Sequence, residues 1–162
     1  MEETGRNLVP SPLVATVLLC ATAINLGGSQ AQKSALLPSI AAGELLMALA
    51  LEETAFHNPS RIQCSAQRNG TGFVLNGHKT LVLDGHVADQ LIVVARTSGA
   101  RDDASGISLF LVDRDTQGLS IKRSEMVDSR NSANIQLHNV QLAEEALLGE
   151  LDKGYEILEK TL

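Results

Sequence analysis

Two adjacent carboxylates and a nearby imidazole, Glu52, Glu53 and His57, are the residues of this chain whose types and spacing most suggest acid–base chemistry. Carboxyl groups and histidine exchange protons near neutral pH when their surroundings tune them. Neighbouring residues of a strand point to opposite faces, so Glu52 and Glu53 form no carboxylate pair if this segment is extended. We therefore favour a solvated strand edge and loop over a local acid–base site.

Two further groups of polar residues are candidates for a metal site or a binding contact. His78 and His86 lie on either side of Asp84, but a metal site needs further ligands at suitable spacing, and none follows. Turn or surface histidines are thus expected, with no metal. Asp128 and Arg130 indicate a loop salt bridge, with contact to a substrate or a neighbouring subunit as the alternative.

Composition excludes some classes of function. The 162 residues are 44% hydrophobic and carry a formal net charge of −6, without a basic stripe that could meet phosphates, so nucleic acid is not an expected partner. Cys20 and Cys64 lie in apolar or strand-like contexts. No secretory signal is visible, and we predict reduced structural thiols and a cytoplasmic location.

The elements that must position these residues begin with helices. Residues 13–26 are mostly apolar, but they fall short of the roughly 20 residues that span a bilayer and are interrupted by Thr16, Thr22 and Asn25, so they predict a buried helix and no membrane insertion. Ser29 is a candidate N-cap for a second helix over Gln30–Ala42. Pro38 is expected to break that helix near Leu37. Residues 151–162 predict the first turns of a last helix.

Between the helices, residues 70–121 indicate strands joined by turns. Asn76-Gly77 predicts a tight hairpin and Asp84-Gly85 a second turn, because both pairs accept positive φ. The apolar run 91–95 predicts a strand buried on both faces. A polar loop at 98–105, a strand at 107–112 and a turn at Gln117-Gly118 complete the pattern.

The strand region resembles the middle β-domain of the acyl-CoA dehydrogenases. The resemblance rests on G-F-V-L-N-G-x-K from Gly72, D-G-x-x-A-D-x-x-I-V-x-A-R-T from Asp84, and G-I-S-L-F-L-V-x-x-x-T-x-G-L from Gly106. It extends over residues 5–162, and it implies a fragment of a longer chain. Details near residues 2–6 and 127–130 look most like the divergent branch with small subunits of pimeloyl-CoA dehydrogenases.

The fold that this resemblance implies is α+β, with N-terminal helices, an antiparallel β-sandwich or open barrel of about seven strands, and the start of a C-terminal helix. We place the end of an N-terminal helical domain at residues 1–43, the middle β-domain at 44–150, and the truncated C-terminal helical domain at 151–162.

The same resemblance implies two segments that face FAD. The first, similar to A-L-T-E-P-x-x-G-S-D, corresponds here to a stretch containing Leu51, Glu52 and Glu53, where Glu52 replaces a threonine and the Gly-Ser-Asp element is missing. The second, similar to W-I-T-N-G, contains Leu81, Val82 and Leu83, without the tryptophan or the hydroxyl. Strand N–H groups bind oxygen whatever the side chain, so backbone contacts could still hold the ring.

The function that the resemblance implies is oxidation of the α,β C–C bond of an acyl-CoA thioester by an FAD-dependent oxidoreductase. Its catalytic glutamate is expected beyond Leu162, so no catalytic residue is assigned and the isolated fragment is expected to be inactive. Expected partners are the thioester and related subunits in a homo- or hetero-oligomer. The alternative is a non-catalytic structural subunit of a heteromeric acyl-CoA dehydrogenase.

Overall fold

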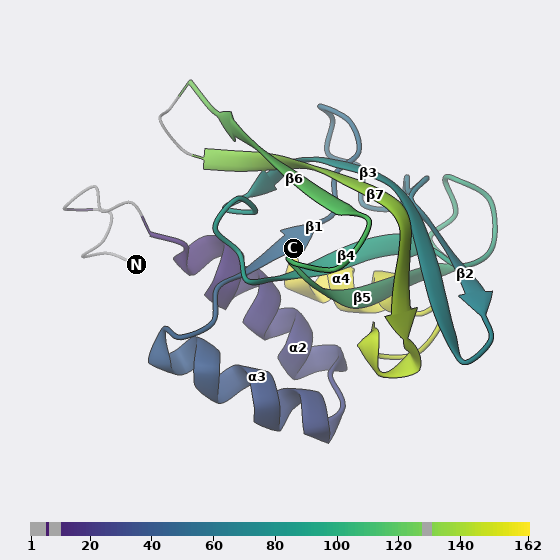
Figure 1. Cartoon of the computed structure of the whole chain (residues 1–162), viewed down its shortest axis with the longest axis horizontal. Helices are drawn as coiled ribbons and strands as arrows, with labels where there is room; N and C mark the ends of the chain where they lie inside the picture. The colour runs from purple at the N-terminus through teal and green to yellow at the C-terminus, as the bar shows by residue number, and fades with distance from the viewer. Residues whose placement is uncertain (1–5, 7–10, 128–130) are drawn as a thin grey trace.

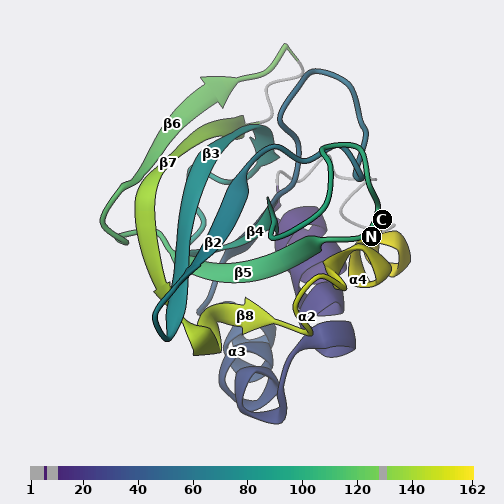
Figure 2. The ribbon, with the colours of Figure 1, turned by 90° about the vertical axis from the view of Figure 1, so that its right-hand side faces the viewer.

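A curved sheet of eight strands forms the centre of the fold, and helices lie along one side of it (Figures 1 and 2). The computed structural model describes residue 6, residues 11–127 and residues 131–162. In chain order the elements are η1 Leu13–Ala21, α2 Thr22–Gly27, α3 Gln30–Ala42, β1 Met47–Ala50, β2 Ser65–Asn69, β3 Gly72–Leu83, β4 Gln90–Arg96, β5 Ile107–Asp113, β6 Leu119–Glu125, β7 Asn131–Ala143, η2 Glu144–Ala146, β8 Leu147–Leu148 and α4 Gly154–Thr161.

The sheet is mixed, which corrects the antiparallel arrangement predicted from the sequence. Its strand order is β6-β7-β3-β2-β4-β5-β8, and β1 pairs with β4 outside this path. β1 runs parallel to β4, with Met47 opposite Gln90, and β2 meets the end of β4 in parallel at Ser65 and Arg96. The remaining pairs are antiparallel. The predicted class of helices, sheet and final helix is confirmed.

Strand β4 is deeply buried, as its continuous apolar sequence predicts. Residues 91–96 are all buried, and β1 and β5 flank this strand on its two edges. The aromatic rings of Phe73 and Phe110 meet edge to face at 4.9 Å in the same core.

The hairpin predicted at Asn76-Gly77 is wrong. Strand β3 continues through both residues, and the pairing with β7 shifts register between Leu75 and Gly77. A Cβ at Gly77 would come within 2.7 Å of Cys64 Cα, so the glycine permits close approach of β2. The β2–β3 turn lies instead at Gly70, which has a φ of 61°.

The other predicted turns are confirmed. Asp84 has a φ of 55° and begins the turn after β3, and Gly118 has a φ of 89° before β6. The loop between β4 and β5 is held by the Arg96 guanidinium, which donates hydrogen bonds to the carbonyl oxygens of Ser98, Arg101, Asp103 and Ser105. It also binds the carbonyls of Ser60 and Ile62, so one side chain fastens two loops.

The first helical segment is continuous over η1 and α2, and η1 has π-helical geometry that the sequence did not predict. Thr16 fastens it to the sheet, because its hydroxyl donates to the Met47 carbonyl at 2.9 Å and accepts from the Met47 N–H at 3.1 Å. One face is buried, whereas Val17 and Leu18 on the other are exposed. Within the described ranges, no helix is long and apolar enough to cross a membrane.

Helix α3 has the predicted bounds and the predicted cap. The Ser29 hydroxyl accepts from the Gln32 N–H while the Gln32 side chain accepts from the Ser29 N–H, which is a capping box. The predicted break at Pro38 is wrong, since the helix continues to Ala42. Pro38 and Ser34 are both exposed, so water can satisfy the Ser34 carbonyl that loses its helical partner.

Helix α4 confirms the predicted C-terminal helix and lies beside α2 (Figure 2). Leu158 is fully buried and Tyr155 packs against the core, so both side chains anchor this helix. Leu162 lies beyond the helix and is half exposed.

Candidate functional site

A buried ion pair joins the two segments that the sequence singled out. Lys79 Nζ lies 2.8 Å from Glu53 Oε1, and the two side chains are 0% and 3% exposed. The same Lys79 Nζ donates to the Leu51 carbonyl at 3.0 Å. The Glu53 carboxylate also accepts from the N–H groups of Gln63 and Cys64, at 2.7 and 2.8 Å. This pair therefore connects the exit of β1, the entry to β2 and the middle of β3.

Electrostatics keep the Glu53 carboxylate charged despite its burial. Burial by itself raises the pKa of this group, but the charge of Lys79 and the hydrogen bonds from Lys79, Cys64 and Gln63 together lower the pKa below its ordinary value of 4.5. Burial raises the pKa of the neighbouring Cys64 thiol to about 11, so this thiol stays protonated and unreactive. Burial likewise raises the pKa of Cys20, and both cysteines are free thiols.

The backbone brings the two segments into direct contact. The Thr80 N–H donates to the Glu52 carbonyl at 2.8 Å, which places residues 51–53 beside residues 81–83. These are the six residues predicted to face a flavin. We call them the β1–β3 edge.

Glu52 points away from the buried pair. Its Oε1 lies 2.6 Å from His57 Nδ1, and the side chains are 22% and 63% exposed. The alternation that the sequence predicted is thus present, with Glu53 buried on Lys79 and Glu52 on the open side with His57. The solvated edge expected for both glutamates is wrong for Glu53, whose side chain is only 3% exposed. The two glutamates do not form a carboxylate pair.

The second segment contains a strained leucine. Leu81 has a φ of 52° at a register shift of β3 between Lys79 and Val82, and it is 45% exposed. Val82 is buried, and Leu83 is half-buried and pairs with Ser132 of β7. A non-glycine residue in the left-handed region is a costly conformation, and such residues are enriched at functional sites.

Two features of this region were not assigned a role from the sequence. One is Lys79, which stands between the polar residues His78 and Thr80 and carried no sequence signal of its burial. The other is Phe56, which is 81% exposed in the loop that follows Glu53. Thr54 shapes this loop, since its hydroxyl donates to the Phe56 carbonyl at 3.2 Å and accepts from the Phe56 N–H at 3.3 Å.

The other sequence candidates lie apart from this edge or take structural roles. His78 Nε2 donates to the Glu53 carbonyl at 3.2 Å. Among the residues that the structure describes, no group of three or more His, Cys, Asp or Glu side chains could hold a metal ion. Asp128 and Arg130 lie outside the described residues.

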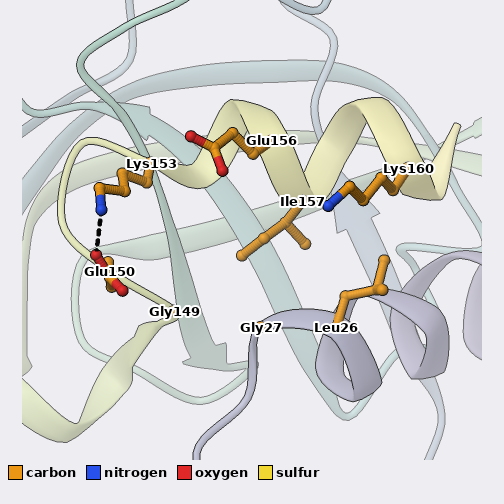
Figure 3. Close-up of a pocket in the computed structure, with 8 residues that line it drawn as sticks. All are labelled: Leu26, Gly27, Gly149, Glu150, Lys153, Glu156, Ile157 and Lys160. Atoms are coloured by element: carbon orange, nitrogen blue, oxygen red, sulfur yellow. Dashed lines mark ion pairs between the residues drawn. The ribbon is translucent and has the colours of Figure 1, made fainter.

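A surface hollow of about 230 Å³ lies between the end of α2 and helix α4, away from the β1–β3 edge (Figure 3). Lys153 and Glu150 pair across its rim at 2.6 Å. Ile157 packs closely against Gly27 within this lining, since a Cβ at Gly27 would lie only 2.3 Å from Ile157 Cδ1. The hollow contains none of the predicted site residues. Its lining is Leu26, Gly27, Gly149, Glu150, Lys153, Glu156, Ile157 and Lys160.

Comparison with known proteins decides the family. Residues 48–140, which include most of β1 and the whole β1–β3 edge, match the acyl-CoA dehydrogenase middle domain. The chain belongs to the acyl-CoA dehydrogenase family. It is 34% identical over 141 residues to the rat (Rattus norvegicus) mitochondrial long-chain specific acyl-CoA dehydrogenase, an alignment that covers 83% of this chain and 33% of the relative.

Solved structures of acyl-CoA dehydrogenases agree in fold. Butyryl-CoA dehydrogenase from Megasphaera elsdenii superposes with a TM-score of 0.85 at 32% identity, covering 93% of this chain and 40% of that one. The Tcur3481-Tcur3483 steroid ACAD superposes with a TM-score of 0.91 at 25% identity, covering 99% and 42%. The chain therefore spans about a third to two-fifths of the length of these relatives.

FAD is the group that this family implies, and the side chains of the β1–β3 edge do not fit its ring. Apart from its single N3–H donor, the oxidised ring presents carbonyl oxygens and ring nitrogens that need hydrogen-bond donors. The side-chain donors here are engaged within the chain: Lys79 on Leu51 and Glu53, and the Thr80 hydroxyl on Asn134 Oδ1 at 2.8 Å. The outward group, the Glu52 carboxylate, only accepts.

Proposed function

We propose that the protein containing this chain is part of an acyl-CoA dehydrogenase-like flavoprotein oxidoreductase. The reaction would remove two hydrogen atoms from the α and β carbons of an acyl-CoA thioester and leave a double bond, with FAD in the assembly accepting the electrons. The observation that carries the proposal is the match of residues 48–140 to the acyl-CoA dehydrogenase middle domain, together with the fold shared with butyryl-CoA dehydrogenase.

Relatives support the substrate class. The rat relative is named for long-chain acyl-CoA and the Megasphaera structure for butyryl-CoA, so proteins with this domain act on thioesters of very different chain length. We extend only the shared chemistry, a saturated acyl-CoA, to this protein. The resemblance to pimeloyl-CoA dehydrogenase small subunits makes a dicarboxylic acyl-CoA the first substrate to try.

Turnover under defined conditions tests this proposal. The intact protein, with any chains that co-purify, would be incubated anaerobically with an artificial electron acceptor and a panel of saturated acyl-CoA thioesters. We expect acceptor reduction together with an enoyl-CoA product that has lost two hydrogen atoms, as measured by mass spectrometry. Absence of both with every thioester would contradict the proposal. We expect the 162-residue fragment alone to be inactive, because it spans only about a third to two-fifths of the length of its relatives.

A second candidate function is a non-catalytic subunit that pairs with an active homologue. The Glu52–His57 pair at the β1–β3 edge favours it, because this edge presents an acceptor where a flavin needs donors. The name Tcur3481-Tcur3483 joins two components in one steroid ACAD, so a two-component arrangement has a structural neighbour. Co-expression with candidate partner chains, followed by gel filtration, distinguishes a hetero-oligomer from a homo-oligomer.

The cellular location follows from the same proposal. Cys20 and Cys64 are buried free thiols, which is what a reducing compartment maintains. We therefore keep a cytoplasmic location as a prediction, and fractionation of cells that make the intact protein tests it.

A further inference from the structure

The fold determines which way Glu52 points. Lys79 draws the Leu51 carbonyl and the Glu53 carboxylate toward the interior, at 3.0 and 2.8 Å. Because successive side chains of an extended segment alternate, Glu52 is left on the opposite, open side. The carboxylate is therefore placed at the β1–β3 edge by a buried interaction and not by a freely rotating surface segment.

His57 then holds the Glu52 side chain in position. Its Nδ1 lies 2.6 Å from Glu52 Oε1, and it follows the turn that Thr54 closes around Phe56. With 22% of its side chain exposed, Glu52 is neither buried out of reach nor fully solvated. A ligand at this edge would contact the Glu52 carboxylate directly and would have to displace the water that hydrates this group.

We propose that Glu52 excludes a flavin ring from this chain, so that the assembly takes its flavin on another chain. This inference rests on the proposed function. Carboxylate oxygens and flavin carbonyl oxygens are both acceptors, so no hydrogen bond forms between them. Removing water from the carboxylate costs free energy, and the charge also repels a reduced, anionic ring.

Titration of the intact protein, purified alone, with FAD tests the inference through quenching of flavin fluorescence. Glu52→Thr supplies a small hydroxyl, and Glu52→Gln keeps the shape of the side chain while removing its charge. We expect both variants to bind FAD at least about tenfold more tightly than the unaltered protein, because one unit charge in partly buried surroundings contributes on that scale. Circular dichroism and thermal unfolding would establish that both variants fold.

Glu144→Gln is the matched control. Glu144 is also a partly exposed carboxylate paired with a basic side chain, that of Arg68, at 2.8 Å. Glu144 follows Ala143, which pairs with Gly72 at the start of β3. Gly72 lies roughly 25 Å along that strand from Thr80, at about 3.3 Å per residue. We expect FAD affinity in this control to equal that of the unaltered protein.

Three results would overturn the inference: stoichiometric FAD in the unaltered protein alone, no gain in either Glu52 variant, or an equal gain in Glu144→Gln. Failure of the proposed function gives a different result, because it is measured as acyl-CoA turnover by the assembly. An assembly that oxidises acyl-CoA while the Glu52 variants gain no FAD would refute this inference alone. Variants that gain FAD in an assembly without turnover would refute the proposed function alone.

Discussion

At the scale of single residues, the Lys79–Glu53 pair connects the fold to the β1–β3 edge. Both side chains are buried, and each has a second hydrogen-bonding partner from the backbone of another segment. A buried pair of this kind is not in itself a net source of stability, but removing one partner leaves an uncompensated charge. The pair thus specifies which residues of this segment face inward.

Replacing the lysine tests that role. We expect Lys79→Met to lower the free energy of unfolding by about 3–5 kcal/mol, because Glu53 stays buried without its cation. The double variant Lys79→Met/Glu53→Gln should recover part of this loss, since glutamine is neutral and still accepts from Cys64 N–H. Urea unfolding of the single and double variants measures both effects. A double variant no more stable than Lys79→Met would contradict this account.

The lowered pKa of Glu53 predicts how stability depends on pH. Its folded pKa lies below its unfolded value of 4.5, so its contribution is fully present above the unfolded pKa and is lost as pH falls through the folded pKa. We expect the free energy of unfolding to decrease on acidification below about pH 4.5, and Glu53→Gln to remove part of that dependence. Chemical unfolding at a series of pH values measures this. An unchanged pH profile in the variant would show that other carboxylates dominate it.

At the scale of elements, the close approach of β2 and β3 depends on Gly77. A Cβ there would meet Cys64 Cα at 2.7 Å, whereas a Cβ at Gly70, which also has positive φ, would meet nothing within 4 Å. Gly70→Ala is therefore the matched control for backbone strain alone.

We expect Gly70→Ala to destabilise the protein by about 1–2 kcal/mol through its left-handed backbone. Gly77→Ala should carry a similar strain and a further loss of about 1–3 kcal/mol from overpacking against β2. Thermal and urea unfolding compare the two variants. Equal losses of stability would mean that β2 shifts without an energetic cost and that Gly77 is required only for its backbone conformation.

Elements with local signals were predictable from the sequence, and those decided by distant contacts were not. The N-cap at Ser29 and the apolar run of β4 depend on neighbouring residues, and both are present as predicted. The Asn76-Gly77 pair carries the same signal for a hairpin as for a bulge, and it is the distant Cys64, just before β2, that decides between them. Helix α3 continues past Pro38 because Ser34, whose carbonyl loses its helical partner there, is exposed to water. This exposure is a property of the tertiary structure.

The same division applies to the candidate site. The opposite directions of Glu52 and Glu53 follow from strand geometry and were expected. The partner of Glu53 is 26 positions away on β3 and depends on how β1 lies against that strand. The parallel pairing of β1 with β4 likewise depends on the return of the chain after the turn at Asp84, and no short motif signals it.

At the scale of the whole molecule, strand β1 links the helical segment to the β1–β3 edge. Thr16 of η1 is hydrogen-bonded to Met47 at the start of β1, and residues 51–53 of the edge follow the end of the same strand. Val17, Leu18 and Leu26 remain exposed on the helical segment, while the edge presents Glu52 and His57 to the outside. The domain has the fold of the acyl-CoA dehydrogenases, but its outward-facing side chains differ from those of the flavin segments that it resembles.

The most direct test of the central claim is the visible absorption spectrum of the intact protein, isolated with its co-purifying chains and recorded before and after anaerobic addition of saturated acyl-CoA thioesters. The account predicts a bound-flavin spectrum in the assembly that bleaches with at least one thioester as the flavin is reduced. A colourless assembly, or a flavin spectrum that no thioester changes, would contradict it.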